Sequence, residues 1–299
     1  MSRPGVDGEE ARAAFENSLG ELRPKLHRYC ARMTGSVIDG EDVVQEAMVK
    51  AINAFPRAGP VADLDGWLFR IAHNAALDFL RRRRRYEAIH SNEELEMIAA
   101  LVNPESDRQA AAASLRTFMR LSTAQRSCVI LMDVLGYSLD EISQVTETSV
   151  PAVKAALHRG RKRLREIASE AEDLSAPALA ESERLLLAKY VDRFNARDFD
   201  TVRDMLADEV RLELVNRTLL NGKREVGRYF HNYTEATDWH LAPGLVDRRP
   251  ALLVRDPRDP SAAPAYFVLL QWDGHKLTNI RDFRHARYVI EGAEVVVPD

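Results

Sequence analysis

Residues 138–165 constrain this chain more than any other stretch, because they combine two helix starts with a short polar turn. Ser138 is followed three residues later by Glu141, which is the capping-box spacing that begins a helix. Residues 146–148 supply a polar turn. Ser149, with a proline shortly after it, is typical of a second helix start. The pattern predicts a helix-turn-helix.

The second predicted helix separates apolar from basic side chains. The apolar residues that recur at helical spacing are Val150, Val153, Leu157 and Leu164. The basic residues are Lys154, His158, Arg159, Arg161, Lys162 and Arg165, with Arg163 beside them. Such a helix can pack on one face and lie in a DNA major groove with the other. A merely solvated amphipathic helix is the alternative, but the two caps and the apolar partner helix favour DNA binding.

Bulk properties limit the class of protein. A length of 299 residues indicates two or three domains, and no apolar run is long enough to cross a bilayer. The first residues show no signal-peptide pattern. The two cysteines, Cys30 and Cys128, lie far apart, which argues against a disulfide framework or a zinc site. We expect a cytoplasmic protein that has no membrane segment, no metal and no cofactor.

The charge is unevenly distributed along the chain. The net charge is −4, yet residues 116–166 hold 9 basic and 5 acidic residues. Residues 86–115 hold 1 basic and 6 acidic residues. Residues 167–299 are acidic as well. A chain that is acidic overall can therefore still bind DNA through local basic segments.

Residues 10–85 are expected to be helical throughout. A stripe of apolar residues predicts a helix over 39–55, ended by Pro56: Val44, Ala47, Met48, Ala51, Ile52 and Phe55. The other face shows Asp42, Gln45, Glu46 and Val49, a mixed strip that suits a partner helix.

A loop over 56–66 and a second long helix over 67–85 follow. Outward positions on that helix are Arg70, Asn74, Asp78 and Arg81, and Trp67 begins it. Its end is a run of five arginines, residues 81–85. One or two cations would satisfy a helix C-terminus, so five indicate a polyanion such as a phosphate backbone.

The last part of the chain changes character. Helical patterns at 181–195, 199–206 and 225–233 mix with strand-like runs at 210–215, 251–255, 265–272 and 276–283. Asp273 and Gly274 mark a hairpin between the last two runs. Helices followed by a mostly antiparallel sheet predict an α+β domain. The expected division is a helical module at 10–85, an acidic linker at 86–112, a helix-turn-helix module at 113–168, a linker at 169–180 and an α+β domain at 181–293.

Three motifs in this order resemble a bacterial sigma factor of the sigma-70 type. They are DVVQE (42–46), GWLFRIAHNAALDFLRRRRR (66–85) and the stretch 121–165. The small extracytoplasmic-function group, which keeps only regions 2 and 4, is similar in order and spacing over about residues 10–168. The resemblance implies two all-α modules that bind core RNA polymerase and promoter DNA, without catalytic chemistry.

The same resemblance implies roles for individual residues. Asp42, Gln45, Glu46 and Val49 would bind the polymerase, through its β′ and β subunits. The loop 56–66 would capture a base flipped from the promoter −10 element. Residues Trp67, Arg70, Asn74, Asp78, Arg81, Arg82 and Arg83 would hold the melted −10 strand. Residues Lys154, His158, Arg159, Arg161, Lys162 and Arg165 would read the −35 element, although Ala155 and Ala156 replace polar residues that the family often carries there.

The C-terminal part resembles the SnoaL-like group of the nuclear transport factor 2-like superfamily, which implies a cone-like α+β fold with a pocket. Candidate polar pocket residues are Asn216, Arg217, Tyr229, His231, Trp239, His240, Asp282 and His285. In sigma factors such a tail is thought to modulate activity through intramolecular contact with the sigma modules. A ligand-sensing or cyclase-like tail stays open as an alternative, as does a helix-turn-helix regulator that works without polymerase.

Overall fold

The computed structural model describes residues 6–58, 61–90, 114–168, 181–234, 236, 239–259 and 262–297. The chain divides into two compact units, residues 1–172 and 173–299. Each unit has its own hydrophobic core. The expected linkers lie largely outside the described residues, at 91–113 and 169–180.

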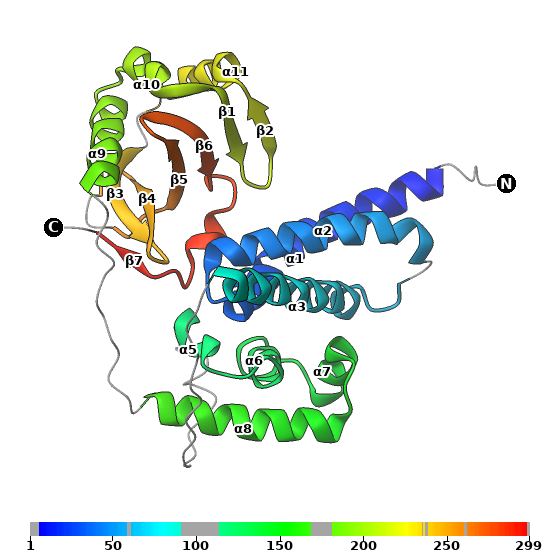
Figure 1. The fold of residues 1–299 in the computed structure, drawn as a ribbon. Coiled ribbons are helices and arrows are strands. Elements are labelled where there is room, and N and C mark those ends of the chain that lie inside the picture. Colours follow the sequence, from blue (N-terminus) through cyan, green and yellow to red (C-terminus); the bar gives the residue numbers. More distant parts are fainter. Residues whose placement is uncertain are drawn as a thin grey trace. The chain divides into compact units, whose positions relative to one another are not determined.

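Three long helices form the first part of the N-terminal unit (Figure 1). They are α1 (Val6–Thr34), α2 (Val37–Ala58) and α3 (Leu64–His90). The apolar stripe of α2 is buried at Val44, Ala47 and Ala51. Phe15 of α1 stacks on Phe55 of α2 with ring centroids 3.9 Å apart. Burial of this stripe holds the helices together, since packing supplies most of a helix's stability.

The structure corrects three boundaries in this part. Pro56 lies inside α2 rather than ending it. A proline has no N–H, so the carbonyl group four residues earlier, at Ile52, lacks its helical donor. Ile52 is exposed near the end of the helix, so water can reach this carbonyl. Ile52 is 41% exposed and so is not a core residue. Helix α3 begins at Leu64 and continues past the arginines into the expected acidic linker.

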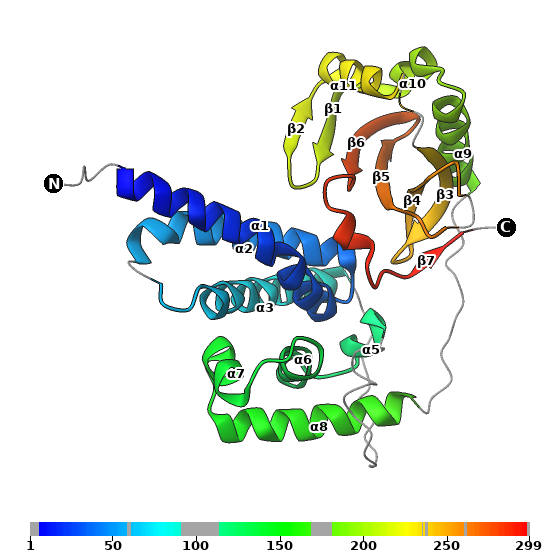
Figure 2. The same ribbon diagram turned by 180° about the vertical axis from the view of Figure 1, so that it is seen from behind.

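Shorter helices form the rest of this unit, as Figure 2 shows from behind. They are α5 (Leu115–Met119), α6 (Thr123–Val129), a π-helical turn (Ile130–Val134), α7 (Leu139–Thr146) and α8 (Val150–Ala168). Ser138 and Glu141 form the predicted capping box at α7. Ser149 Oγ accepts a hydrogen bond from the backbone N–H of Ala152 at 3.4 Å, at the start of α8. The helix-turn-helix prediction is therefore confirmed, with α7 and α8 as its helices.

The C-terminal unit is a curled sheet with helices at its start. Its elements are α9 (Glu181–Asn195), α10 (Phe199–Met205), β1 (Leu206–Leu214), β2 (Thr218–Asn221), α11 (Lys223–Tyr229), a 3-10 turn (Phe230–Tyr233), β3 (His240–Val246), β4 (Arg249–Arg255), β5 (Tyr266–Asp273), β6 (Lys276–Asp282), a 3-10 turn (Arg287–Ile290) and β7 (Val295–Val296). The strand order is β2-β1-β6-β5-β4-β3-β7. All pairs are antiparallel except β1 with β6. The α+β fold class is thus confirmed.

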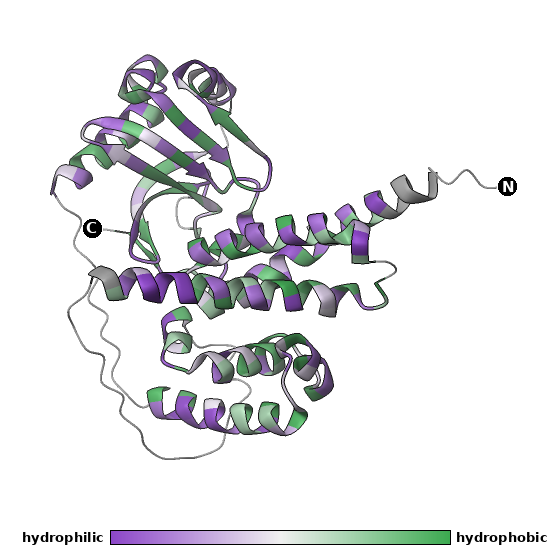
Figure 3. Cartoon of the chain, turned by 45° about the vertical axis from the view of Figure 1, so that its right-hand side comes forward, coloured by the Kyte–Doolittle hydropathy of each residue, from purple (hydrophilic) through white to green (hydrophobic). Residues whose placement is uncertain are grey.

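Hydrophilic and hydrophobic residues alternate along these helices and strands (Figure 3). In β1, for example, Val210, Leu212 and Leu214 are buried while the residues between them are not. The helix over 181–195 and the hairpin between β5 and β6 were predicted from such periods. Strands β2, β3 and β7 were not predicted.

Candidate nucleic-acid interface

Helix α2 presents the mixed strip to solvent. Asp42, Gln45 and Val49 are exposed, and Glu46 is half-buried. Residues 42, 46 and 49 lie at i, i+4 and i+7, so the period of the helix aligns them on one face. Val49 is 53% exposed, and an exposed aliphatic side chain beside carboxylates suits a protein partner.

Helix α3 presents a basic and polar face. Arg70, Asn74 and Arg81 are exposed, and Asp78 is half-buried. Their spacing of four, four and three residues keeps them along one side of the helix. Trp67 is half-buried, with its ring centroid 6.3 Å from that of Phe15. This face has the cations and the aromatic ring that single-stranded nucleic acid needs.

The strip on α2 and the basic face on α3 are joined by ion pairs. Arg82 Nη2 donates to Glu46 Oε2 at 2.7 Å, and Lys50 Nζ lies 2.8 Å from Glu46 Oε1. Lys50 also lies 3.7 Å from Asp78. Burial alone would raise the pKa of Glu46, but the hydrogen bonds from Arg82 and Lys50 outweigh it and hold that pKa below its usual value. A group predicted to bind polymerase is therefore paired with one predicted to bind DNA.

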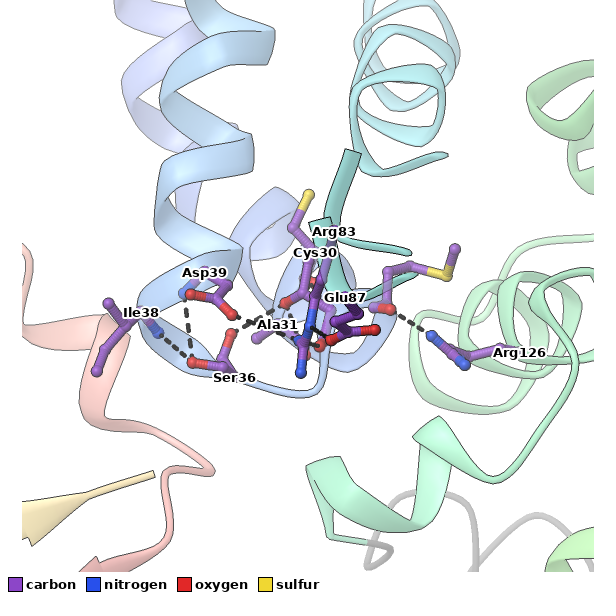
Figure 4. Close-up of polar contacts among 10 residues, drawn as sticks. Cys30, Ala31, Ser36, Ile38, Asp39, Arg83, Glu87 and Arg126 are labelled. Carbon is purple, nitrogen blue, oxygen red and sulfur yellow. Dashed lines mark hydrogen bonds and ion pairs between the residues drawn. The ribbon is translucent and has the colours of Figure 1, made fainter. Parts of the chain in front are cut away.

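Arg83 lies differently from its neighbours in the arginine run. Its Nε donates to Glu87 Oε1 at 2.9 Å, and its Nη1 donates to the carbonyl oxygen of Thr34 at 3.4 Å. A carboxylate oxygen of Asp39 lies 3.7 Å away (Figure 4). Arg83 thus ties the end of α3 to the junction of α1 and α2. All five arginines of the run, Arg83 included, are exposed.

Helix α8 exposes only part of its predicted DNA-binding set. Lys154, His158 and Arg159 are exposed, whereas Arg161, Lys162 and Arg165 are half-buried. Arg161 Nε donates to Asp133 Oδ2 at 3.0 Å, and its Nη2 donates to the other carboxylate oxygen. The Asp133 side chain is only 1% exposed. Arg161 therefore neutralises a buried charge inside the module.

A glycine that the sequence analysis did not single out lets α8 pack closely. A Cβ on Gly160 would lie 2.7 Å from Val129 of α6. Together with buried Val153, Leu157 and Leu164, it fixes which face of α8 is turned inward. Lys154, His158 and Arg159 consequently face away from the core.

Comparisons with known proteins agree with this geometry. The N-terminal unit matches two families, Sigma-70 region 2 over residues 19–86 and Sigma-70 region 4 over residues 115–164. The RNA polymerase sigma factor CarQ of Myxococcus xanthus is 32% identical over 162 residues, which is 54% of this chain and 93% of CarQ. The chain belongs to the sigma-70 family.

Other relatives extend further along the chain. The extracytoplasmic-function (ECF) RNA polymerase sigma factor SigG of Mycobacterium tuberculosis is 32% identical over 235 residues, which is 69% of this chain and 62% of SigG. This chain thus spans less than two thirds of SigG. The solved structure of the M. tuberculosis sigma factor SigJ covers 89% of this chain and 95% of SigJ at 18% identity and a TM-score of 0.35. An NTF2-like protein of Cytophaga hutchinsonii covers 32% of this chain and 94% of its own, with 14% identity and a TM-score of 0.26.

Regions 2 and 4 of the chain pack against each other. Lys25 Nζ of α1 lies 2.9 Å from Asp65 Oδ2 and donates to the hydroxyl of Tyr137 at 3.0 Å. That hydroxyl donates in turn to Asp65. The ring of Tyr137 lies 5.0 Å from that of Phe69. Residue Tyr137 of region 4 therefore contacts region 2 beside the loop predicted to capture a base.

Three further contacts join the same regions. Arg126 Nη1 donates to the carbonyl oxygen of Met33 at 2.5 Å, and the guanidinium of Arg32 lies 5.8 Å from the ring centroid of Phe118. Arg70, on the predicted −10 face, lies 4.0 Å from Glu147 in the turn of the helix-turn-helix. Sequence reasoning did not single out Arg126 or Tyr137, since neither an arginine in a short helix nor a tyrosine in the loop before α7 carries a local signal of a tertiary contact.

The candidate pocket residues of the C-terminal unit are dispersed. Trp239, Asp282 and Tyr229 line one pocket. His240 and His285 are exposed and do not line it, and the same holds for Asn216, Arg217 and His231. Successive side chains of an extended chain point to opposite sides. His240 follows buried Trp239 directly, so its side chain points away from the pocket. His285 follows the end of β6, where an exposed turn begins.

Asp282 is the buried carboxyl group of this pocket. Its Oδ2 accepts from the Tyr233 hydroxyl at 3.2 Å, and its Oδ1 accepts from the backbone N–H of Arg284 at 2.8 Å. Burial raises the pKa of Asp282. The hydroxyl of Tyr229 lies 3.5 Å from that of Tyr233.

Among the residues of the described ranges, no group of three His, Cys, Asp or Glu side chains could hold a metal ion. None of the described helices is both long and apolar enough to span a bilayer.

Proposed function

We propose that this sigma factor binds core RNA polymerase through α2 and directs it to promoters through α3 and α8. The supporting observation is that one compact unit exposes three surfaces. They are the mixed strip of Asp42, Gln45 and Val49, the α3 face of Arg70, Asn74 and Arg81, and the α8 face of Lys154, His158 and Arg159. The first surface binds the β′ subunit. The second holds the melted −10 strand, and the third reads the −35 element.

Physical chemistry explains why these surfaces occur together. Holding a flipped base costs a few kcal/mol, so cations and a stacking ring such as Trp67 are needed to offset it. Each small DNA-binding surface alone binds weakly and loses affinity steeply with salt. Attachment of both surfaces to one polymerase raises the effective concentration of each for its own element. The protein itself performs no catalytic chemistry in this function and acts where the polymerase is, in the cytoplasm.

The packed arrangement of regions 2 and 4 is the state of the free protein in this proposal. The centres of the −10 and −35 elements are separated by about 25 base pairs, or about 85 Å of B-DNA at a rise of about 3.4 Å per base pair. A compact globule of some 165 residues is only about 40 Å across. The two regions must separate to reach both elements at once. Contacts of Tyr137, Arg126 and Glu147 with region 2 are broken in that step.

Run-off transcription tests the proposal. Core polymerase is combined with the full-length protein on the upstream region of the protein's own gene, and with variants of each surface. Asp42→Ala with Val49→Ala should abolish core binding in a pull-down, whereas Lys154→Ala should leave core binding intact and lower promoter-specific transcription. Glu209→Ala, at an exposed position of the C-terminal unit, is the control. Tight operator binding by the free protein, without any core binding, would instead support a polymerase-independent regulator.

The C-terminal unit is proposed to modulate this activity. It follows the sigma regions as a unit with its own core, and it is acidic while the −35 helix is basic. A protein ending at Glu172 keeps the whole N-terminal unit. Higher run-off activity of that shorter protein would show that the C-terminal unit restrains the sigma factor, and lower activity would show that it assists. Equal activity at every salt concentration would contradict modulation.

A further inference from the structure

The amide group of Gln45, in the mixed strip of α2, is hydrogen-bonded to an arginine of α1. Arg23 Nη2 donates to Gln45 Oε1 at 2.9 Å. Arg23 is only 7% exposed, whereas Gln45 is exposed. A side chain of the strip that is predicted to bind polymerase is thus tied to a buried cation.

A buried carboxylate fixes Arg23 in this position. Arg23 Nε donates to Glu41 Oε1 at 3.2 Å, and Nη2 donates to the same oxygen. The Glu41 side chain is only 1% exposed. Two buried charges keep their geometry, because each would be left without compensation if the other moved away. Arg23 is therefore a fixed donor rather than a mobile surface cation.

The chemistry of Arg23 decides which end of the Gln45 amide is turned outward. A guanidinium group has five N–H donors and no acceptor, so the amide atom that faces it must be the oxygen. The Nε2 amino group is then directed away from Arg23. Within the described part of the chain, no atom accepts a hydrogen bond from this amino group. Gln45 thus offers N–H donors, rather than its oxygen, to a partner.

Gln45 lies between the outer members of the strip. Asp42, Gln45 and Val49 are at i, i+3 and i+7, so they share one face of α2. A mobile glutamine loses rotamer freedom when it makes a contact, whereas a glutamine that is already held loses less. A hydrogen bond from a charged donor also polarises the amide, which strengthens its N–H groups as donors. Both effects favour binding to a hydrogen-bond acceptor opposite Gln45.

We propose that Arg23 is a positioning residue for polymerase binding, because it holds Gln45 so that the amide donates to an acceptor oxygen of core polymerase. Arg23 itself does not touch the polymerase. This inference rests on the proposed function of α2. It adds which end of the Gln45 amide is used, which chemistry lies opposite it, and why a buried residue of α1 matters for binding.

Two replacements of Gln45 test which end of the amide is used. The affinity of the full-length protein for core polymerase is measured by fluorescence anisotropy. Gln45→Met has a similar length but no amide, so its affinity should fall by about two- to tenfold. Gln45→Glu keeps an oxygen for Arg23 but turns a second oxygen toward the acceptor. Its affinity should fall further than that of Gln45→Met, by at least about tenfold from the wild type.

A matched control separates this effect from the change in net charge. Gln271→Glu makes the same change at an exposed glutamine of β5, and it should bind core polymerase as the wild type does. The proposal is overturned if Gln45→Glu binds core polymerase as tightly as Gln45→Met or more tightly. Such a result would mean that the polymerase donates to Gln45 instead.

Arg23→Met with Glu41→Met tests the positioning role without leaving a buried charge unpaired. Urea denaturation checks that this double variant is folded. Gln45 can then turn, so its Nε2 resonances in ¹⁵N-labelled protein should show greater motion. Added to this background, Gln45→Glu and Gln45→Met should no longer differ in core affinity. A difference that persists, or Gln45 resonances as rigid as in the wild type, would show that Arg23 does not position Gln45.

Failure of this inference can be distinguished from failure of the proposed function. Wild-type core binding by Asp42→Ala with Val49→Ala would show that α2 does not bind polymerase, and both would fall. Loss of core binding in that variant, together with a contradictory result in the Gln45 series, would overturn this inference alone.

Discussion

Arg126 of region 4 donates a hydrogen bond of 2.5 Å from Nη1 to the carbonyl oxygen of Met33, the penultimate residue of α1 in region 2. Its other donors reach the carbonyl oxygens of Phe118, Met119 and Leu121. Arg126 is only 3% exposed, and burial lowers its pKa to about 10. A buried cation thus gathers four carbonyl groups, one of which belongs to the other region. A planar guanidinium with five donors suits this role, whereas an ammonium group does not.

Replacement of Arg126 tests this anchor. Arg126→Met should lower the free energy of unfolding by about 2–3 kcal/mol, because buried carbonyl groups lose a charged donor. Arg126→Lys should recover only part of the loss, since lysine lacks the fork of donors. Urea denaturation measures the change, and Arg116→Met, at an exposed position of α5, should stay within about 0.5 kcal/mol of the wild type. A wild-type unfolding curve for Arg126→Met would show that the anchor contributes nothing.

The contact of Tyr137 with Lys25 and Asp65 should govern how readily regions 2 and 4 separate. Tyr137→Phe keeps the ring beside Phe69 but removes the hydroxyl that bonds both charged groups. The packed state should lose about 0.5–1.5 kcal/mol, which is a shift of about two- to tenfold toward separation. Fluorescence energy transfer between dyes on cysteines at Glu21 and Gln144 reports the distance. Both positions are exposed.

The two native cysteines should not react with the dyes, so the introduced cysteines are labelled specifically. Cys30 and Cys128 are buried, and burial raises the pKa of both thiols, that of Cys128 to about 11. Since the thiolate is the reactive form, neither should compete with an exposed cysteine for maleimide. Addition of core polymerase should abolish energy transfer in the wild type. Energy transfer that is the same in Tyr137→Phe and wild type, with and without polymerase, would refute the role of this contact.

Local signals in the sequence were sufficient for the helix-turn-helix and for the α+β fold class. The Ser138 and Glu141 box works within four residues of chain, so it can be recognised without knowing the tertiary structure. The helix over 181–195 has a clear apolar period, and its predicted bounds are those of α9. By contrast, the sequence alone could not separate Arg161 from the other residues of α8 that are predicted to bind DNA. Its partner, Asp133, is 28 residues away and meets it only when α8 packs.

Strand β3 was missed for a physical reason of the same kind. Its sequence contains Pro243 and Gly244, which usually mark turns. In the fold, β3 pairs with β7 only at Leu245 and Val246, so Pro243 has β4 on one side and no strand of the described chain opposite. A proline is tolerated at such an edge. Gly244 is required by close packing, since a Cβ there would lie 2.5 Å from Leu253.

Removal of the Lys154 side chain should weaken DNA binding, whereas removal of the Arg161 side chain should lower the stability of the fold. Lys154→Ala should leave stability within about 0.5 kcal/mol of the wild type and reduce the salt slope of −35 DNA binding by about one. Arg161→Ala leaves the buried carboxylate of Asp133 without its partner, so it should lower the free energy of unfolding by about 2 kcal/mol. Thermal denaturation and salt-dependent DNA binding by the holoenzyme separate the two effects. The division of roles on α8 fails if Arg161→Ala is as stable as Lys154→Ala.

Acidification should destabilise region 2 through two buried histidines. Burial lowers the pKa of His27 and of His73 to about 4 each. His27 Nε2 donates to the carbonyl oxygen of Val37 at 2.9 Å, and the Tyr29 hydroxyl lies 2.6 Å from His73 Nδ1. The unfolded chain takes up protons at a pKa of about 6.5, before the folded one does. The free energy of unfolding should therefore fall as pH decreases from about 6.5 toward 4, and be retained above 6.5.

Urea denaturation between pH 7 and pH 5 measures this slope, which should approach about 1.4 kcal/mol per pH unit for each histidine. His27→Gln with His73→Gln removes both titrating groups while keeping amide donors and acceptors. The double variant should be less stable than the wild type at pH 7 and should show a flatter pH dependence. His275→Gln, in an exposed turn of the other unit, should keep the wild-type slope. If the free energy of unfolding of the double variant and of the wild type falls equally with decreasing pH, the acid sensitivity comes from the carboxylates instead.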